Sequence, residues 1–476
     1  MADVKTGEFQ QASSDVLANE KLQAHLARSM GVFDLARQDA IDELSEDRWE
    51  ELREEGRRIK AHTLNNLDFY LDLLTDRILE NGGQVHFATD SEEAKAIVGR
   101  IAKSRNLKRA IKSKSMVSEE IGLNEYLDEI GVEPVETDLG EYIIQLAEET
   151  PFHLIAPAMH KTKEEVSELF KDKLDRPNLT EIEDMADAAR EVLREKLISA
   201  DLGITGANFL VAETGTLVLV TNEGNGRFCT SVPKVHIAIA GMEKLIPSLE
   251  DLGVFIRLLP RAATGQRISS YVTHISGPRR NHDEDGPEEF HLIIVDNGRS
   301  ELLKEPELRE ALYCIRCGAC LNACPVYKKV GGHAYGWVYP GPIGAVISPM
   351  LVGLERAKDL PQASSLCGAC RDVCPIKINI PRMLLKLRNE LAEGEVGAPI
   401  TERLVAKIYR WFMSNPHLIT KVRKLMIWPL RLFEDQGVIK HVPFPPLSKW
   451  TKARDLKMLP SKSFREIWQD KLSEKE

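Results

Sequence analysis

Seven of the eight cysteines lie in one short stretch, and their spacing is typical of metal ligands. A first run with the spacing Cys-x2-Cys-x2-Cys-x3-Cys-Pro begins at Cys314, and a second run, Cys-x2-Cys-x3-Cys-Pro, begins at Cys367. In bacterial-type ferredoxin sites, three thiolates of such a run hold one iron–sulfur cluster and the fourth ligates the other cluster. The two runs therefore predict cluster 1 at Cys314, Cys317, Cys320 and Cys374, and cluster 2 at Cys324, Cys367 and Cys370.

Cluster 2 has only three cysteine ligands in this stretch. The spacing requires a cysteine three residues before Cys367, but the chain has Ser364 there, and the one remaining thiol is Cys229. Cluster 2 could be a three-iron cluster, a cube with a serine or water ligand, or a cube completed from elsewhere in the chain. Ser364 and Cys229 are the candidate extra ligands.

Zinc and disulfide bonds are the alternative roles for these cysteines. A zinc site usually pairs two Cys-x2–4-Cys knuckles into one four-ligand site, and seven cysteines with ferredoxin spacing are too many for that. Disulfides are disfavoured because the first twenty residues lack the apolar core of a secretory leader. We therefore expect a cytoplasmic protein whose thiols stay reduced.

Residues 221–230, TNEGNGRFCT, form a glycine-rich polar loop after an expected strand. Its backbone amides and Arg227 could hold a small carboxylate. The alternative is a tight loop that Gly224 and Gly226 shape for structural reasons.

Two further positions could contribute to an active site. His160 and Lys161 follow an expected strand at 152–158, where open α/β sheets place ligands, although a structural or solvent-facing histidine is the simpler interpretation. Glu213 resembles the acidic position of CoA-transferase-like folds, but an exposed carboxylate at a strand end fits it equally well.

The pattern of apolar residues divides the 476-residue chain into four regions. Residues 1–83 are expected to be helical, with one long amphipathic helix over 47–80. Residues 84–300 alternate strands and helices, which predicts an α/β domain with a largely parallel sheet, a helix over 242–251, and a hairpin joining 266–276 to 290–298. Residues 301–390 hold both cysteine runs, and the apolar, aromatic segment between the runs should pack over a cluster. Residues 391–476 form a mostly helical C-terminal segment.

Charge is unevenly distributed along the chain. The net charge is −10, which argues against general nucleic-acid binding, yet residues 401–476 carry 16 Lys and Arg against 8 Asp and Glu. This basic segment also contains Trp411, Trp428, Trp450 and Trp468. It could bind an acidic partner, lie against the inner face of a membrane, or form a solvated helical surface. No run of about 18 apolar residues occurs, so no transmembrane span is expected.

The sequence resembles the lactate utilisation protein B family. The resemblance rests on CIRCGACLNACPVYKKVGGHAYGWVYPGPIG, CGACRDVCP, KSKSMVSEEIGLNEYL, VETDLGEYIIQLAEE, APAMHKTKEEV and ETGTLVLVTNEGNGR, and it covers almost the whole chain. It implies an α/β domain similar to ribose-5-phosphate isomerase and CoA-transferase-like proteins, followed by an α-helical two-cluster ferredoxin module. The family pattern maps onto the same seven cysteines and leaves the eighth ligand open.

The resemblance also implies a function. Members of the family are iron–sulfur subunits that carry electrons while L-lactate is oxidised to pyruvate, together with two companion proteins and an unidentified electron acceptor. The chain has no G-x-G-x-x-G loop after a strand and no Walker loop, so we expect another subunit to accept the hydride. The alternatives are a subunit for another 2-hydroxy acid, such as glycolate, and a metabolite-binding protein whose clusters are structural.

Overall fold

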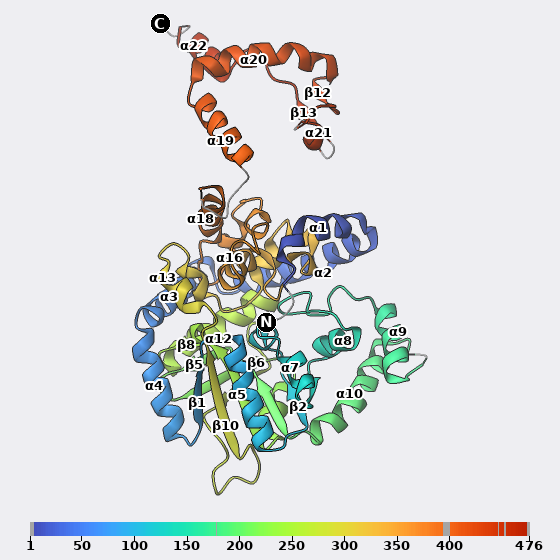
Figure 1. The fold of residues 1–476 in the computed structure, drawn as a ribbon, viewed down its shortest axis with the longest axis vertical. Helices are drawn as coiled ribbons and strands as arrows, with labels where there is room; N and C mark the ends of the chain where they lie inside the picture. The colour runs from blue at the N-terminus through green and yellow to red at the C-terminus, as the bar shows by residue number, and fades with distance from the viewer. Residues whose placement is uncertain (1–3, 178, 394–399, 446, 452–453, 474–476) are drawn as a thin grey trace. The chain divides into compact units, whose positions relative to one another are not determined.

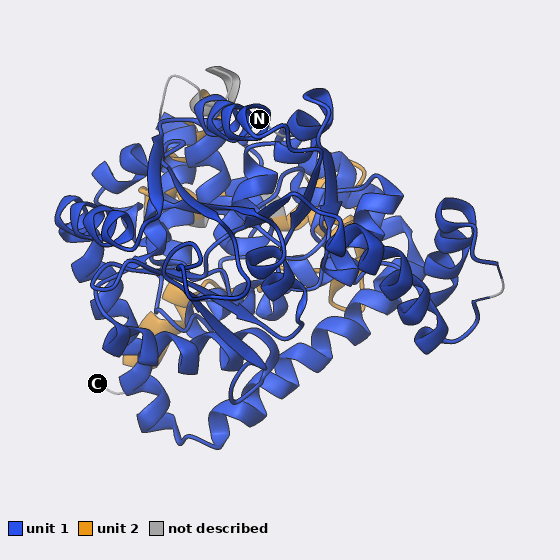
Figure 2. Ribbon diagram, turned by 90° about the horizontal axis from the view of Figure 1, so that it is seen from below, with its two compact units in different colours: residues 1–396 blue, residues 397–476 orange. Residues whose placement is uncertain are grey.

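The computed structural model describes residues 4–177, 179–393, 400–445, 447–451 and 454–473. Its residues group into two compact units, 1–396 and 397–476, which Figure 2 distinguishes by colour. The first unit contains both the α/β region and the segment with the cysteine runs.

The first unit is built around a six-stranded sheet in which every pair of neighbouring strands is parallel (Figure 1). In spatial order its strands are β1 (Gln84–Ala88), β10 (Glu289–Val295), β7 (Val235–Gly241), β4 (Leu202–Thr205), β2 (Arg109–Lys112) and β3 (Glu133–Glu136). Strand β7 is buried along its whole length, as expected for a parallel strand covered on both faces. The predicted α/β domain with a largely parallel sheet is confirmed.

Alternate residues of the strands face two different layers. On one face, Ile293 and Val295 of β10 pack with α5 (Ser91–Ser104), α6 (Met116–Glu120) and α7 (Leu123–Glu129). On the other face, Leu292 and Ile294 belong to the core shared with the second sheet and the cysteine segment. The same side of β2 and β3 is covered by α8 (Leu139–Ala147), α10 (Ile182–Ile198) and α11 (Asn225–Ser231).

The second sheet has four strands, in the order β8 (Leu245–Ile246), β5 (Phe209–Val211), β6 (Thr216–Thr221) and β9 (Tyr271–Ile275). Strands β5 and β6 form an antiparallel pair around Gly215, whose φ of +65° suits a residue without a side chain. The predicted hairpin between 266–276 and 290–298 is wrong. Strand β9 pairs with β6, whereas β10, an almost wholly buried apolar run, lies inside the parallel sheet.

Three expected elements differ from the structure for local reasons. The expected helix over 47–80 is two helices, α3 (Glu46–Asn65) and α4 (Leu67–Glu80), because Asn66 leaves the helical conformation at φ −126°. The helix expected over 242–251 is replaced by a short 3-10 turn, η2 (Met242–Lys244), and β8, and α12 (Leu249–Thr264) begins only after its N-cap Ser248. The strand expected over 152–158 is a loop, which a hydrogen bond from Phe152 N to Pro157 O closes at 2.9 Å.

The cysteine segment is a compact set of short helices. Its elements are η3 (Arg309–Tyr313), α14 (Ala319–Ala323), α15 (Tyr327–Val330), η4 (His333–Tyr335), α16 (Gly341–Val352), η5 (Leu360–Gln362), α17 (Ala369–Asp372) and α18 (Ile380–Glu393). The aromatic residues between the two runs are buried, among them Tyr327, Tyr335, Trp337 and Tyr339. This segment is therefore part of the core, as its composition predicted.

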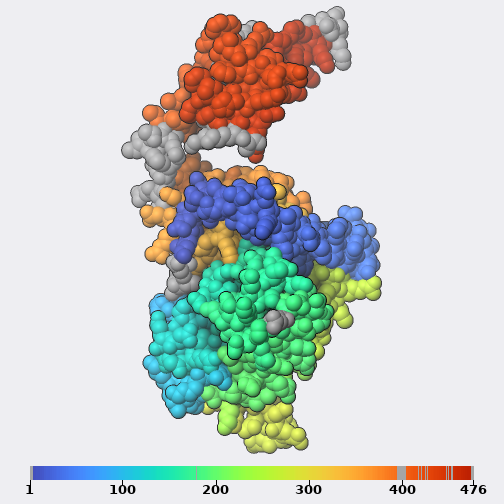
Figure 3. All heavy atoms as spheres, turned by 90° about the vertical axis from the view of Figure 1, so that its right-hand side faces the viewer, coloured from blue at the N-terminus to red at the C-terminus, as the bar shows by residue number. Residues whose placement is uncertain are grey.

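The N-terminal helices bridge the cysteine segment and the α/β region. Helices α1 (Phe9–Ala18) and α2 (Glu20–Asp42) contact α15, α2 also contacts α14, and both α2 and α3 contact α12. Figure 3 shows these helices in blue, lying against the orange cysteine segment. The elements of unit 1 not yet named are η1 (Thr6–Glu8), α9 (Lys163–Leu174) and α13 (Arg299–Lys304).

The second unit has its own small core, formed by Leu430, Ile439 and Val442. Its elements are α19 (Ile400–Met413), α20 (Pro416–Leu430), η6 (Arg431–Phe433), β11 (Glu434–Asp435), β12 (Val438–Ile439), α21 (Leu447–Trp450), β13 (Leu456–Lys457) and α22 (Phe464–Ser473). Its four tryptophans are all more than half exposed. Within the described parts of the chain, no helix combines the length and apolar character needed to cross a bilayer.

Candidate metal centre

Four cysteines from the two runs surround one small cavity. They are Cys314, Cys317, Cys320 and Cys374, the residues predicted for cluster 1. The rest of the wall is mostly apolar and includes Leu154, Ile343 and several isoleucines on the loop that follows Cys374. Four thiols in an apolar setting are the donor set that a cubic iron–sulfur cluster requires, so the residues present fit such a group.

The first cysteine loop is shaped by two residues with positive φ. Arg316 has φ +60° and Gly318 has φ +75°, and together they turn the chain tightly before α14, which carries Cys320. Cys374 reaches the cavity from the second run and is held by Arg53 of α3, which donates to the Cys374 carbonyl oxygen at 3.0 Å from Nε and 2.8 Å from Nη2. A residue 321 positions away thus fixes the fourth member of the group.

Burial and nearby amides act in opposite directions on the thiol groups. Burial raises the pKa of Cys374 to about 11, although the amide of Ile378 donates to its sulfur at 3.4 Å and favours the thiolate. The amide of Arg316 similarly donates to the sulfur of Cys314 at 3.4 Å. Such bonds to sulfur raise the potential of a bound cluster. A bound metal would also supply the positive charge that keeps a buried thiol deprotonated.

The cysteines predicted for cluster 2 form a second group. Burial, and after it the charges of Cys324 and Cys367, raises the pKa of Cys370 to about 12. Cys324 and Cys370 are buried, but Cys367 is exposed. Ser364 is half-buried, and its hydroxyl oxygen accepts a hydrogen bond from Leu366 N at 3.1 Å. Its role as a ligand stays a prediction.

Cys229 lies in a different part of the core. It belongs to α11 and packs with Ile111, Val135 and Tyr142, whereas six of the other cysteines, all except the exposed Cys367, belong to or pack against the larger core. Its sulfur is 3.7 Å from Thr137 Oγ1, and burial raises its pKa to about 12. The structure therefore does not bring Cys229 to the three cysteines of the second group.

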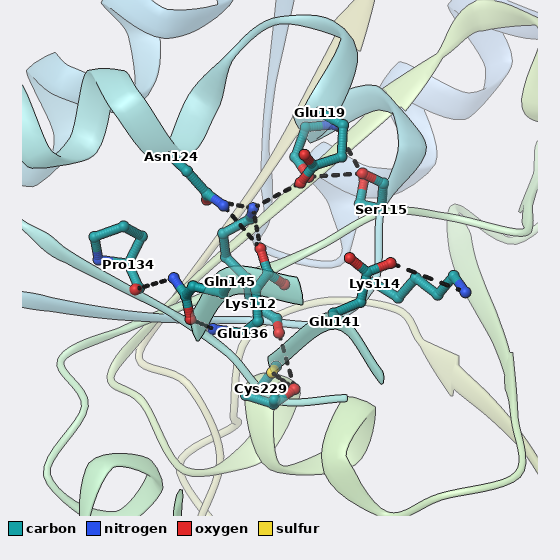
Figure 4. A network of polar contacts seen from close by, with 12 residues as sticks. Lys112, Lys114, Ser115, Glu119, Asn124, Pro134, Glu136, Glu141, Gln145 and Cys229 are labelled. Atoms are coloured by element: carbon teal, nitrogen blue, oxygen red, sulfur yellow. Dashed lines mark hydrogen bonds and ion pairs between the residues drawn. The ribbon is translucent and has the colours of Figure 1, made fainter. Parts of the chain in front are cut away.

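A buried ionic network lies close to Cys229 (Figure 4). Lys112 is ion-paired with Glu136 at 2.6 Å and hydrogen-bonds Asn124, and Glu119 lies 3.4 Å away. Burial would lower the pKa of Lys112, but Glu136 and Glu119 more than offset this and raise it. Lys112 is thus satisfied within the network and serves to hold the end of β2 against α6 and β3.

A second buried network joins the α/β region to the cysteine segment. Arg299 donates to Glu120 at 2.8 and 2.7 Å and to Glu243 at 2.7 Å, and all three side chains are at most 1% exposed. Glu120 also accepts from Tyr339 Oη at 2.6 Å, and Glu243 lies 3.3 Å from Arg316 Nη2. Burial alone would raise the pKa of Glu243, but the charges of Arg299 and Arg316 lower it to about 2. The network therefore fixes the side chain of Arg316, which lies in the loop between Cys314 and Cys317.

A larger cavity of about 460 Å³ adjoins the first one, because Leu154 and Cys317 line both. It lies at the carboxyl end of the parallel sheet, where it is lined by residues 113–115 after β2, 206–208 after β4, and Ile239 of β7. Open α/β sheets bind ligands at this edge. We refer to this space as the sheet-edge cavity.

Three cationic side chains line the sheet-edge cavity: Lys114, Lys244 and Arg316. Burial lowers the pKa of Lys244 to about 8. Burial also lowers the pKa of Lys114, against the influence of Glu141 3.9 Å away, and raises the pKa of Glu141 to about 8 (Figure 4). Asp138 and the exposed Glu223 contribute the carboxylates of the lining.

The predicted glycine-rich loop contributes to this cavity, but its arginine does not. Five of its residues line the cavity: Thr221, Asn222, Glu223, Asn225 and Gly226. Arg227 instead is exposed and lies over the ring of Tyr271, 5.3 Å from the centroid. The cations available to a carboxylate in the cavity are therefore Lys114, Lys244 and Arg316, not Arg227.

The other two predicted positions lie away from the cavity. His160 follows a loop, not a strand; it bonds Glu149 at 2.7 Å, and burial lowers its pKa to about 4. Lys161 pairs with the same carboxylate, and the ligand atoms of Glu149, His160 and His333 lie within 4.8 Å of one another. Glu213 is exposed, and its side chain accepts from Leu249 N at 3.2 Å at the start of α12.

Sequence reasoning missed Lys244, Lys114 and Arg316 as a group. Lys114 had a local signal, because it lies in the polar loop KSKS directly after a strand. Lys244 and Arg316 had none, because one lies in an expected helix and the other inside a cysteine run. Only the packing of the two regions brings them to one cavity.

Comparisons with known proteins agree with the two-part organisation of unit 1. Residues 71–295 match the LUD domain family, and residues 310–378 match the 4Fe-4S dicluster domain family. A protein of Bacillus licheniformis named lactate utilization protein B is 45% identical over 473 residues, covering 99% of this chain and 98% of that protein. A protein of the same name from Bacillus subtilis is 44% identical over 469 residues, covering 98% of this chain and 97% of that protein. One from Macrococcus caseolyticus is 47% identical over 428 residues, covering 89% of this chain and 89% of that protein. A solved DUF162 family protein from Deinococcus radiodurans covers 48% of this chain and 98% of its own at 17% identity, with a TM-score of 0.28.

Proposed function

Because the chain belongs to the lactate utilization protein B family, we propose that it is the electron-transferring iron–sulfur subunit of a system that oxidises L-lactate to pyruvate. A role in lactate utilisation and a domain for iron–sulfur clusters follow from the family itself. The observation that carries the electron-transfer role is the cavity at which cysteines of both runs meet.

The arrangement of the two cysteine groups supports passage of electrons between them. The pKa of Cys320 in the first group is raised first by burial, then by Cys314 and Cys317, and then by Cys370 of the second group. Helices α14 and α17, which carry Cys320 and Cys370, are in contact. Iron–sulfur clusters held by these groups would take up the two electrons of lactate one after the other. We propose a 4Fe-4S cluster at the first group and leave the type of the second open, because it has three cysteines.

The exposure of the two cysteine groups supports one direction for the proposed electron pathway. The first group borders the sheet-edge cavity, whereas the second includes the exposed Cys367. Electrons would enter at cluster 1 and leave at cluster 2, where an acceptor protein can approach.

The proposed partners are two companion lactate-utilisation proteins and an electron acceptor. The second unit is suited to docking an acidic partner, because residues 401–476 have an excess of eight positive charges and exposed tryptophans. The same features would allow contact with the anionic inner face of a membrane.

The test is EPR spectroscopy of the anaerobically purified complex with its companions, before and after addition of L-lactate. We expect lactate to reduce the clusters, and the Cys317→Ser variant to lose the cluster 1 signal. Cys229→Ser is the matched control, because it removes a buried thiol outside both groups. Clusters that stay oxidised in a complex that still produces pyruvate would exclude this chain from the electron path, and reduction by glycolate in preference to lactate would reassign the substrate.

A further inference from the structure

We propose that the sheet-edge cavity binds a small organic carboxylate, of the 2-hydroxy or 2-oxo acid class, with Lys244 and Arg316 holding its carboxylate group beside cluster 1. This inference rests on the proposed function, and it assigns the substrate site to this chain and to named residues. Neither cation was among the ligands expected from the sequence.

The position of the cavity in the sheet is the first argument. From β2 the chain moves outward to β3 and then returns to β4 on the other side of β2, so the strand order reverses between β2 and β4. The loops after these two strands supply Ser115 and Asn208 to the cavity lining. In open α/β sheets the crevice at such a reversal is the usual ligand site.

The second argument is the state of the two cations. Lys244 is 9% exposed and makes no hydrogen bond or ion pair within the described residues. The Arg316 side chain is also 9% exposed; Nη2 faces Glu243, but Nη1 has no partner among the described residues. Because buried charges are normally paired, the incompletely paired side chains of Lys244 and Arg316 favour the binding of an anion. Arg316 is held in place by Glu243 and by the Tyr339 ring 4.8 Å away, which suits it to a fixed carboxylate.

The neutral lining suits the rest of such an acid. Asn208 Oδ1 accepts from Val220 N at 2.9 Å, which leaves its amide nitrogen as a donor, and Ser115 adds a hydroxyl group. Leu154 and Tyr339 supply apolar wall. The exposed Asn222 and Glu223 mark a solvent-accessible side through which a ligand can enter. At about 460 Å³ the cavity exceeds a three-carbon acid, so part of it would hold water.

The proposed carboxylate site lies next to the cavity predicted to hold cluster 1. Cys317 lines both cavities, so a carboxylate beside Arg316 would lie against the wall of the cluster cavity. An anionic cluster is the competing partner for the same two cations, because the sulfur of Cys314 contributes to the electrostatic surroundings of both Lys244 and Arg316. The experiment must therefore separate ligand binding from charge balance of the cluster.

The test is isothermal titration calorimetry of the anaerobic, cluster-loaded full chain with sodium L-lactate, sodium pyruvate and, as the larger anion, flavin mononucleotide. We expect lactate or pyruvate to bind, and Lys244→Met to weaken binding at least about tenfold because a charge-assisted hydrogen bond is lost. Lys244→Arg keeps the charge and should retain most of the affinity. Arg227→Met, which removes an exposed cation outside the cavity lining, should bind as the parent does.

Two outcomes would overturn the proposal. If neither acid binds to a chain with intact clusters, a small-acid site is excluded, whether or not the flavin binds. Unchanged affinity in Lys244→Met together with a shifted cluster 1 potential would assign this lysine to charge balance instead. The calorimetry needs no turnover, so its failure is distinct from failure of lactate to reduce the clusters in the complex.

Discussion

Replacing Arg299 by methionine would leave two buried carboxylates without the cation that they share. The Arg299 side chain makes three hydrogen bonds to carboxylates, two to Glu120 and one to Glu243, and a fourth to the carbonyl oxygen of Asp296. None of the Arg299, Glu120 and Glu243 side chains is more than 1% exposed. Because Glu120 lies on α6 and Glu243 contacts Arg316 in the cysteine run, the change acts on the contact between the α/β region and the cluster segment.

The cost should be large because the remaining charges are desolvated. Removing one partner of a buried ion pair typically destabilises a protein by about 3–5 kcal/mol. Tyr339 would still donate to Glu120, and Arg316 would still face Glu243, which keeps the loss within that range. Arg105→Met is the matched control. It breaks the ion pair with Glu289, in which Arg105 is 47% exposed, and such solvent-screened pairs contribute little to stability.

The measurement is urea-induced unfolding of the anaerobic protein, followed by circular dichroism, with cluster absorbance recorded in parallel. We expect Arg299→Met to lower the unfolding midpoint far more than Arg105→Met and to release the cluster sooner. A double variant, Arg299→Met with Glu120→Gln, should regain part of the loss because one uncompensated charge is removed. Equal midpoints for the two single variants would refute the reasoning.

Three further changes test the site and its support. Arg53→Met should speed loss of cluster 1, followed by its visible absorbance, because it removes the donors to the Cys374 carbonyl; an unchanged rate would contradict this. Gly318→Ala should cost about 1–2 kcal/mol, measured by urea unfolding, because φ there is +75°; a stability equal to that of the parent would show that the loop adapts. His236 is fully buried beside Thr205, and burial lowers its pKa to about 3, so below pH 6.5 only the unfolded chain gains the proton. Stability should therefore fall by about 2 kcal/mol from pH 7 to pH 5 on its account, and His236→Asn should show a shallower fall with pH; equal slopes would argue against a neutral histidine.

The features that the sequence predicted depend on neighbours along the chain. The spacing from Cys314 to Cys324 constrains a short loop and helix, and the four cysteines expected to share cluster 1 do line one cavity. The alternation of strands and helices over 84–300 predicted a largely parallel sheet, and its strand β7 is mostly apolar and buried along its whole length because a parallel strand is covered on both faces. The likeness to ribose-5-phosphate isomerase and CoA-transferase-like folds stays a prediction, as does the four-region division.

The features that it missed depend on distant parts of the chain. The apolar run at 152–158 suggested a strand, but the turn closed by Phe152 and Pro157 competes with strand pairing. The pairing of β9 with β6 is decided by which face each strand must bury, and no local pattern reports that.

The most informative case is Arg316, which sits inside the strongest motif and was still overlooked. It lies between two cysteines and adopts a left-handed φ of +60° in the tight loop. The structure shows that the same turn directs the side chain to Glu243, Tyr339 and the sheet-edge cavity. A cluster loop that merely held metal could place a small residue there. An arginine whose charge is only partly neutralised within the fold is better explained if the α/β region and the cluster act on one bound anion, which the calorimetry with Lys244→Met tests directly.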